Sequence, residues 1–386
     1  MKIENSLYFI RENDEILENA FINWRFVLLF GARQIGKTTL ADKYFENVSM
    51  KKIKIQGQNK DIQRSLGDLS LSRIKIVIGE ADFIFIDEAQ YIPDIGTVLK
   101  LIYDTMPNVK VLATGSSAFG LASKTNEALT GRKISLSAFA LSLHEINNNE
   151  IFDNIYYHTE ELLLYGNYPK VLANKNSNTK KEILIELAES YLYKDVLEFH
   201  GIRKAPAIAK LAKMLAFQVG SQVSLSELAR GLEINKATVQ NYIDVLIKSF
   251  IIFPLTAYSR NHRKELTTSM KYYFYDNGIL NAIIKNFSNF DERQDLGHLW
   301  ENFIVSELYK RYTYDKKLFT MYHWRTYDQK EVDIVLEVNG KLEAYECKYN
   351  DDKTTVNKSV AKAWNELYPD TKINIINKSN FMEYLK

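Results

Sequence analysis

The feature that most constrains the fold is a glycine-rich segment set between an apolar run and a helical pattern. The segment Gly31-Ala-Arg-Gln-Ile-Gly36-Lys37-Thr38 matches the pattern G-x-x-x-x-G-K-[ST], with the β-rich residues 26–30 before it and a helical pattern over 38–44 after it. Its glycines let successive backbone N–H groups point at one anion, at the positive end of a helix. We therefore expect a strand, a phosphate-binding loop and a helix.

This loop predicts that the chain binds ATP together with Mg²⁺. Lys37 is expected to reach the β- and γ-phosphates, and the Thr38 hydroxyl is expected to ligate the magnesium. The residues expected to line the nucleotide are Gly31, Ala32, Arg33, Gln34, Ile35, Gly36, Lys37, Thr38 and Thr39.

A second part of the site is expected at the end of a later strand. Four apolar residues, 83–86, are followed by Asp87 and Glu88, and ligands of open α/β sheets collect at the carboxyl ends of strands. Asp87 is predicted to hold magnesium, and Glu88 to polarise the attacking water as a general base. The alternative is a buried strand that ends in two solvated acids.

Two further segments carry groups that could act on the γ-phosphate. The strand expected at 109–113 ends near Thr114 and Ser116, whose hydroxyls could bind that phosphate or the water; a simple Ser/Gly turn is the alternative. Arg132 follows Gly131 and could stabilise charge in the transition state, or could be a solvated arginine after a turn. If Arg132 acts across subunits, a ring or dimer is required.

The hydrophobic pattern changes along the chain and divides it into three predicted domains. Short apolar runs alternate with helical patterns up to residue 138, as in a parallel α/β sheet, and helices dominate after residue 144. From about residue 297 a helix leads into three strands and a hairpin at Gly340. We expect an ATPase module at 1–145, a helical region at 146–260 and a small α/β domain at 261–386.

The middle region contains a predicted winged helix-turn-helix. Residues 225–232 and 236–246 form two helical patterns around a short turn, and an apolar strand follows at 251–255. Four residues of the second helix should face outward and could enter a DNA major groove: Lys236, Thr238, Gln240 and Asn241. The basic cluster Arg260, Arg263 and Lys264 could add phosphate contacts, or form a solvated loop. Such folds also often only join domains.

The C-terminal region places four charged residues where they could form a second site. Strand alternation puts Glu346 and Lys348 on one face, and the hairpin brings Asp333 beside them, while Glu301 lies on a preceding helix. Carboxylates gathered in this way could hold Mg²⁺ and activate a water, with Lys348 steadying the anion. The alternative is an exposed hairpin face with paired charges.

Composition is that of a globular protein: 46 % of residues are apolar and 25 % are charged, and the net charge of +2 predicts no general affinity for nucleic acid or membranes. The single cysteine excludes an internal disulfide and fits the cytoplasm. No segment is long and apolar enough to predict a signal peptide or a membrane span.

These motifs together resemble a large group of prokaryotic AAA-type ATP-binding proteins. Members join such an ATPase to a C-terminal domain of unknown function that is similar to the restriction-endonuclease-like fold. The resemblance implies an ATPase core and that C-terminal fold. It is carried by residues 31–39, 85–90, 113–117, 129–132, 275–278, 297–302, 324–326, 331–333 and 345–348. One departure is Asn277, where the group leads us to expect threonine.

Three functions are consistent with the sequence. The leading hypothesis is an ATP-driven switch that controls how the helix-turn-helix and the C-terminal domain engage a partner, with nucleic acid expected. The second is a Mg²⁺-dependent DNA nuclease regulated by ATP. The third is an ATP-dependent regulator that binds another protein and no DNA. The small number of cations on the second helix of the helix-turn-helix favours this hypothesis. The sequence leaves the oligomeric state open.

Overall fold

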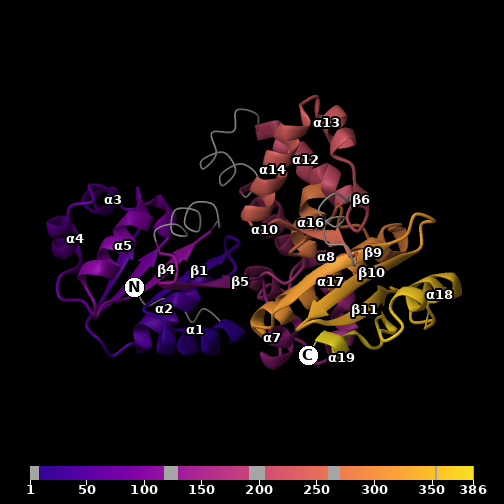
Figure 1. Ribbon diagram of the computed structural model, residues 1–386, viewed down its shortest axis with the longest axis horizontal. Coiled ribbons are helices and arrows are strands. Elements are labelled where there is room, and N and C mark those ends of the chain that lie inside the picture. The colour runs from indigo at the N-terminus through magenta and orange to yellow at the C-terminus, as the bar shows by residue number, and fades with distance from the viewer. Residues whose placement is uncertain (1–7, 117–128, 191–204, 260–269, 353, 386) are drawn as a thin grey trace. The chain divides into compact units, whose positions relative to one another are not determined.

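The computed structural model describes residues 8–116, 129–190, 205–259, 270–352 and 354–385, and these form two compact units (Figure 1). Unit 1 contains the described residues up to 140, with 248–250, and unit 2 contains the others. The predicted basic cluster Arg260, Arg263 and Lys264 lies outside the described residues.

Unit 1 is built on a parallel five-stranded sheet in the order β2-β3-β4-β1-β5. All residues of β1 and β3 are buried, as expected for strands covered on both faces. The apolar runs in the sequence therefore predicted these strands correctly. The strands are β1 Phe26–Gly31, β2 Lys52–Gln56, β3 Phe83–Asp87, β4 Lys110–Gly115 and β5 Lys133–Ala138.

Helices cover the sheet of unit 1 in two groups. Helices α1 and α2 contact each other and β1, and α3, α4 and α5 contact one another around a shared apolar core (Figure 1). The helices are α1 Glu12–Asn23, α2 Lys37–Asn47, α3 Lys60–Gly67, α4 Leu71–Ile78 and α5 Ile95–Thr105, with a 3₁₀ turn η1 at Ala89–Tyr91.

Unit 2 combines helices with a seven-stranded mixed sheet in the order β12-β11-β10-β9-β7-β8-β6. The strands are β6 Gln222–Val223, β7 Ile252–Ala257, β8 Met270–Phe274, β9 Phe319–Arg325, β10 Glu331–Val338, β11 Lys341–Cys347 and β12 Ile373–Ile376. The helices and 3₁₀ turns are α7 Leu143–Asn148, η2 Ile155–His158, α8 Thr159–Tyr165, α9 Pro169–Leu172, α10 Ser177–Ser190, α12 Ala205–Phe217, α13 Leu225–Leu232, α14 Lys236–Lys248, α16 Asn277–Ile284, η4 Phe290–Glu292, α17 Leu296–Tyr314, α18 Lys358–Leu367 and α19 Phe381–Leu385. Of the helices in the described part of the chain, none combines the length and apolar character that crossing a membrane requires.

One sheet runs through the two regions that the sequence divided at residue 260. Strand β7 pairs antiparallel with β8, and at its other edge it pairs parallel with β9 through Thr256 and Ala257. Residues 270–274, which the sequence assigned to the last domain, thus pair with strands of the middle region. The boundary between the two units, after residue 140, lies close to the predicted limit of 145.

The β10–β11 hairpin fixes the positions of the C-terminal charged residues. Asn339 and Gly340 both have positive φ, 50° and 76°, as a two-residue type I′ turn requires. In the resulting register Ile334 is opposite Tyr345, so Asp333 and Glu346 are the next residues along their strands. The hairpin that the sequence predicted at Gly340 is confirmed.

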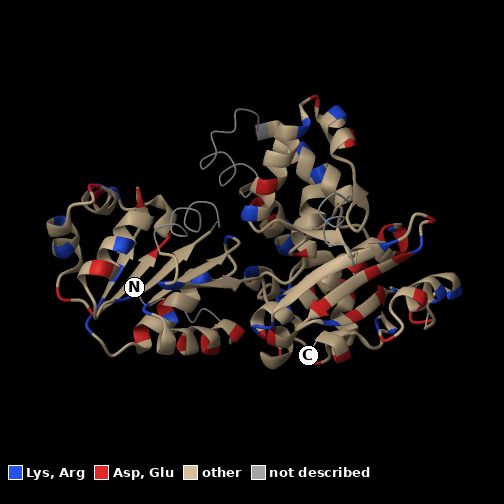
Figure 2. Ribbon diagram, viewed as in Figure 1, with Lys and Arg blue, Asp and Glu red and all other residues tan. Residues whose placement is uncertain are grey.

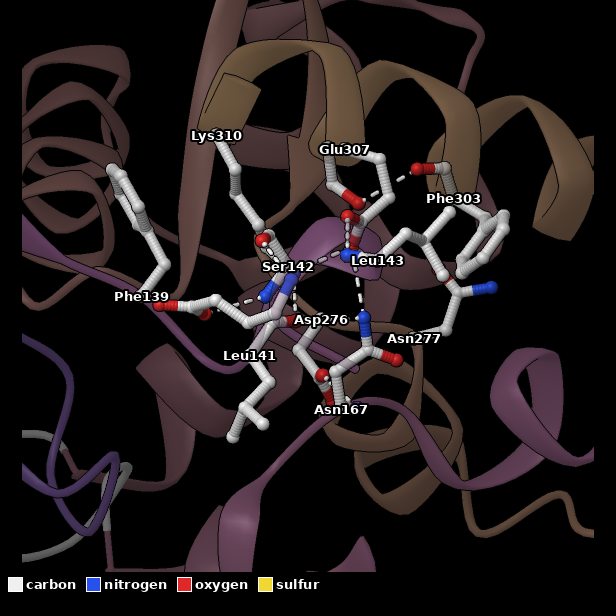
Figure 3. Close-up of polar contacts among 12 residues, drawn as sticks. Phe139, Leu141, Ser142, Leu143, Asn167, Asp276, Asn277, Phe303, Glu307 and Lys310 are labelled. Atoms are coloured by element: carbon white, nitrogen blue, oxygen red, sulfur yellow. Dashed lines mark hydrogen bonds and ion pairs between the residues drawn. The ribbon is translucent and has the colours of Figure 1, made fainter. Parts of the chain in front are cut away.

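A buried polar network holds α17 against the start of unit 2 (Figure 3). The Glu307 carboxylate accepts hydrogen bonds from the Leu143 backbone N–H, at 2.8 Å, and from the Asn167 amide, at 2.8 Å. Lys310 donates to Glu307 at 2.6 Å and to the Leu141 carbonyl at 3.2 Å. Because each buried charge has a partner, the network avoids the cost of an unpaired ion.

The segment Tyr275-Asp-Asn-Gly278 has a structural role in this network. Asp276 accepts from the Asn167 backbone N–H at 2.7 Å and caps α16 through the Ile279 N–H at 3.1 Å. A Cβ at Gly278 would lie 2.2 Å from the Tyr165 carbonyl oxygen, so only glycine fits there. Asn277, the departure from the expected threonine, donates from its amide to the Leu299 carbonyl at 2.9 Å.

Candidate functional site

The glycine-rich loop of unit 1 lies between β1 and α2, as the sequence predicted. Gly36 is the N-cap of α2 with φ 96°, a left-handed conformation that side chains disfavour. At Gly31 a Cβ would lie 2.1 Å from the Ala138 carbonyl oxygen, which shows how closely the loop approaches the end of β5. Gln34 and Thr39 are exposed, and Ile35 is fully buried and anchors the loop.

Lys37 is buried at the start of α2. Its ammonium donates to the Gly31 carbonyl at 3.0 Å and to the Ala32 carbonyl at 2.7 Å. Arg33, four residues earlier in the loop, donates to the Tyr91 hydroxyl at 3.3 Å. The loop therefore carries a cation beside the N–H groups that open α2, which is the arrangement that suits a polyphosphate.

Asp87 lies at the carboxyl end of β3, where it receives two hydroxyl groups. Thr38 Oγ1 donates to Asp87 Oδ1 at 2.9 Å, and Thr114 Oγ1 donates to the same oxygen at 2.6 Å. Hydroxyl and carboxylate oxygens are the hard ligands that magnesium prefers. Thr38 and Asp87 thus fit the magnesium site that the sequence predicted for them.

Glu88 is held in place by a residue that the sequence did not single out. Its backbone is left-handed, with φ 51°, and its N–H donates to Thr114 Oγ1 at 3.1 Å. Gln90, which is buried, donates from one amide nitrogen to the Glu88 carboxylate and to Ser116 Oγ, the latter at 3.1 Å. Gln90 therefore links Glu88 to Ser116. In the sequence, the only sign of this role is that an amide side chain follows Glu88 by two residues.

Two more residues shape the loop without having been predicted. Arg11 is buried, and it donates to the Ile35 carbonyl at 2.8 Å and the Phe139 carbonyl at 2.7 Å, which ties the loop to the segment after β5. Gly57 lets the backbone after β2 approach β3: a Cβ there would lie 2.3 Å from the Glu88 carbonyl oxygen. Neither residue belongs to a recognisable motif.

The structure does not bring Arg132 to the loop of its own chain. Strands β1 and β5 are parallel, with Phe26 opposite Lys133 and Gly31 opposite Ala138. Arg132 thus precedes β5 at the amino edge of the sheet, roughly 17 Å along the strand from the carboxyl edge that holds the loop. There its guanidinium pairs with Asp104 at 2.8 Å and lies over the Tyr103 ring.

A second candidate site lies in unit 2, where a pocket of about 510 Å³ opens beside the carboxylates predicted from the C-terminal motifs. Three of the four predicted residues, Glu301, Asp333 and Lys348, line it. Glu346 accepts from Lys348 Nζ at 2.5 Å, which confirms that the two side chains share a face. The other lining residues are Gln294, Leu296, Gly297, His298, Cys347, Tyr349 and Asn350.

Burial perturbs the carboxylates of this pocket. It raises the pKa of Asp333 to about 7, with help from the nearby Glu301 carboxylate, and the Cys347 N–H donates to Asp333 Oδ2 at 2.8 Å. Burial and the Asp333 charge raise the pKa of Glu346 to about 7. Because they are buried and lie near other carboxylates, these two carboxyl groups bind protons more readily than ordinary acids do.

The magnesium site predicted for these carboxylates stays a prediction. Within the described residues, no three acidic, histidine or cysteine side chains are arranged to hold one metal ion. Lys271 of β8 lies beside one of them: its ammonium is 3.3 Å from Glu301 Oε1 and pairs closely with Glu331. The sequence patterns gave no signal for Lys271.

The two helices predicted around the turn are present as α13 and α14, but two of the four proposed contact residues have local partners. Lys236 and Asn241 on α14 are exposed. Thr238 donates from its hydroxyl to Asn235 Oδ1 at 2.9 Å, as part of the cap of α14, and Gln240 donates to Asp244 at 3.0 Å. Helices α13 and α14 carry both basic and acidic residues, whereas the charged residues of α12 are all lysines (Figure 2). The apolar residues on the inner face of the two helices are all fully buried: Leu228, Val239, Ile243 and Leu246.

Comparison with known families agrees with the geometry of unit 1. Residues 23–147 match a family described as AAA domain. Unit 1 is therefore similar to AAA domains. Residues 157–289 and 296–384 match two families that are each described as a domain of unknown function, DUF8612 and DUF4143.

Relatives extend over most of the chain. An uncharacterized protein of Mycobacterium tuberculosis is 28 % identical over 327 residues, covering 83 % of this chain and 70 % of that protein. One of Methanocaldococcus jannaschii is 24 % identical over 372 residues, covering 91 % and 80 %. The similarity thus includes both units.

Among solved structures, a Walker-type ATPase of Pyrococcus abyssi is similar at 16 % identity and a TM-score of 0.48, covering 72 % of this chain and 96 % of that one. A RuvB variant of Thermotoga maritima is similar at 15 % identity and a TM-score of 0.32, covering 67 % and 95 %. Both TM-scores are too low to carry an inference about this chain.

Proposed function

We propose that unit 1 binds ATP with magnesium and hydrolyses it, and that this cycle controls how unit 2 engages a partner. One observation carries the proposal: the hydroxyls of Thr38 and Thr114 both donate to Asp87 Oδ1. Thr38 directly follows Lys37, the cation of the loop. This is the constellation that P-loop enzymes use to bind a triphosphate and its metal ion. The AAA-type match over residues 23–147 supports it.

Each residue of the site has a definable task in this reaction. The N–H groups at Gly36 and the first turn of α2, with the Lys37 ammonium, hold the phosphates. Thr38 and Asp87 would hold magnesium, which neutralises the charge that develops on the phosphate oxygens. Glu88 accepts the proton of the attacking water, and Gln90 fixes the orientation of its carboxylate.

ATP turnover by the purified full chain tests the catalytic assignment. Lys37→Ala removes the phosphate-binding cation, so turnover should be abolished; wild-type turnover in this variant contradicts the proposal. Glu88→Gln keeps the shape of the side chain but not its basicity, so nucleotide binding should persist while turnover falls about 10²- to 10⁴-fold. Lys75→Ala, at an exposed position on α4, is the matched control and should turn over normally.

For the partner we propose nucleic acid, bound through α14. The elements α12, β6, α13, α14, β7 and β8 follow one another in the order of a winged helix-turn-helix, and β6 and β7 both pair with β8. In such folds the second helix of the turn enters the major groove. The exposed Lys236 and Asn241 on α14 are the residues best placed for contact.

A binding assay separates a nucleic-acid partner from a protein partner. The full chain, with and without ATP, is titrated against a labelled DNA duplex at several salt concentrations. Lys236→Glu should weaken binding and reduce its salt dependence, because one phosphate contact is lost. Lys358→Glu, an exposed lysine at the start of α18, carries the same charge change as a control. Absence of binding at low salt would favour a protein partner instead.

A further inference from the structure

Two arginines of unit 1 are badly placed to stabilise charge on a transferring phosphate. Arg132 precedes β5, at the edge of the sheet opposite the phosphate loop. Arg11 is buried, and its guanidinium donates to two backbone carbonyls. Lys37 is expected to hold the β- and γ-phosphates. The loop, residues 31–38, contains one more cationic side chain, which is Arg33.

Arg33 reaches from the loop to the turn that follows the proposed general base. Its guanidinium donates to the hydroxyl of Tyr91, which ends the 3₁₀ turn η1 that begins directly after Glu88. The Tyr91 backbone N–H donates to the Glu88 carbonyl at 3.2 Å, so these two residues are one turn apart. The guanidinium therefore lies on the side of the loop that faces this turn. A γ-phosphate must lie on the same side if Glu88 activates the attacking water.

The contact with Tyr91 suits a guanidinium that exchanges one acceptor for another. The hydroxyl is a neutral acceptor, so this bond does not cancel the positive charge of Arg33, and its length of 3.3 Å is above the usual range for N–H···O bonds. Arg33 is half-buried, so its side chain is not locked in the core. Phosphate oxygens accept charge-assisted and often bidentate bonds from arginine, which are stronger than a bond to a neutral hydroxyl.

We propose that Arg33 is a catalytic residue of the ATPase site. With ATP bound, its guanidinium donates to the γ-phosphate oxygens and stabilises the charge that develops on them. Water forms a new bond to the γ-phosphorus and gives a proton to Glu88, while ADP leaves with the electron pair of the broken P–O bond. Arg33 keeps its protons throughout, and Tyr91 holds the guanidinium until ATP binds. This inference rests on the proposed function and gives Arg33 the task that the sequence suggested for Arg132.

Turnover and transition-state binding by the full chain test the assignment of Arg33. Arg33→Ala should lower kcat about 10²- to 10³-fold and change ATP affinity by about threefold or less, because the contact strengthens in the transition state. Affinity for ADP with Mg²⁺ and aluminium fluoride, which mimics the transferring phosphate, should fall by a factor similar to that of kcat. Arg64→Ala, at an arginine of α3 whose side chain is 82 % exposed, is the matched control and should behave as the wild type.

Tyr91→Phe separates a catalytic role of Arg33 from a structural one. It removes the hydroxyl and keeps the guanidinium, so kcat should fall far less than in Arg33→Ala. Equal losses in the two variants, with the affinity for aluminium fluoride and ADP unchanged, would make Arg33 a structural link between loop and turn and overturn the proposal. If Arg33→Ala does not fold, Arg33→Gln, which keeps a donor without the charge, takes its place.

Failure of this inference differs from failure of the proposed function. If the wild-type chain does not turn over ATP, both are wrong. If the wild type turns over ATP and a folded Arg33→Ala protein does so at the same rate, the assignment of Arg33 alone is wrong. A loss confined to ATP affinity, with kcat unchanged, also overturns it, because the guanidinium would then act equally on the bound nucleotide and on the transition state.

Discussion

Each unit of this protein places carboxylates near a lysine, but the partners of those carboxylates differ. In unit 1, Asp87 accepts hydrogen bonds from the neutral hydroxyls of Thr38 and Thr114. In unit 2, Glu301 and Glu331 face the ammonium of Lys271. A neutral donor leaves the negative charge of its acceptor in place, whereas an ammonium cancels it.

This difference shows that the role of a charged residue depends on the groups that contact it, and not on the sequence motif alone. The Asp87 charge remains available to attract a bound cation, so its value to the molecule lies in ligand binding. The charges of Glu301 and Glu331 are balanced within the fold, so their value lies in holding three elements together. Substitutions should therefore damage activity in unit 1 and stability in unit 2.

The largest effect is expected from Lys271→Met. The buried Glu301 carboxylate loses its counterion, whereas the half-buried Glu331 keeps Arg325 nearby. Breaking a buried ion pair costs about 3–5 kcal/mol. Urea denaturation monitored on the unit 2 tryptophans should report this loss. The double variant Lys271→Met/Glu301→Gln removes an unpaired charge and should recover part of it. A loss below about 1 kcal/mol would mean that the pair is effectively solvated and the comparison fails.

Asp87→Asn should show the opposite behaviour. The amide oxygen can still accept from Thr38 and Thr114, so the free energy of unfolding should change by about 1 kcal/mol or less. The charge that a bound cation requires is lost, and ATP turnover should fall about 10²- to 10³-fold. Steady-state turnover and urea denaturation on the same preparation measure both effects. A large loss of stability with turnover intact would reverse the roles of the two units.

A smaller effect is expected from Gln90→Ala, which removes the amide that holds Glu88. Turnover should fall by about tenfold, or 1.4 kcal/mol, because the general base is less well oriented. The decrease should appear in kcat, with nucleotide affinity unchanged. A rise in KM alone would instead assign Gln90 to the shape of the binding loop.

The smallest effect is expected from Arg132→Ala. Its ion pair with Asp104 is partly exposed, with side chains 35 % and 42 % accessible, so stability should change by about 0–1 kcal/mol. Turnover by dilute protein should be unaffected, since the residue lies at the opposite edge of the sheet. Turnover that rises with protein concentration, and that Arg132→Ala suppresses, would show that the arginine serves the site of a neighbouring subunit.

Local patterns were sufficient to predict most elements of the fold. Strands β1 and β3 are continuous apolar runs, and the glycine-rich loop, the helix pair α13–α14 and the hairpin at Gly340 each carry a short-range signal. The same signals placed Asp87 and Thr114 at the ends of neighbouring strands and Thr38 at the start of a helix, and the structure brings the three together. Such elements depend on residues close in sequence.

What the sequence could not predict depends on which distant elements meet. The sequence around Lys271 gives no sign that this lysine is buried in an ion pair, because its partners Glu301 and Glu331 belong to other elements. The distance between Arg132 and the loop follows only from the parallel pairing of β1 with β5. Likewise, the pairing of β7 with β9 joins two regions that the hydrophobic pattern of the sequence had separated.

The position of Cys347 has a practical consequence. It is the single cysteine of the chain, it lines the pocket between Glu346 and Lys348, and burial raises the pKa of its thiol. A thiol reagent will therefore react slowly with the folded protein and faster whenever β11 separates from its neighbours. The native sequence thus provides a built-in kinetic probe of opening at this one strand, with no need for engineered labels.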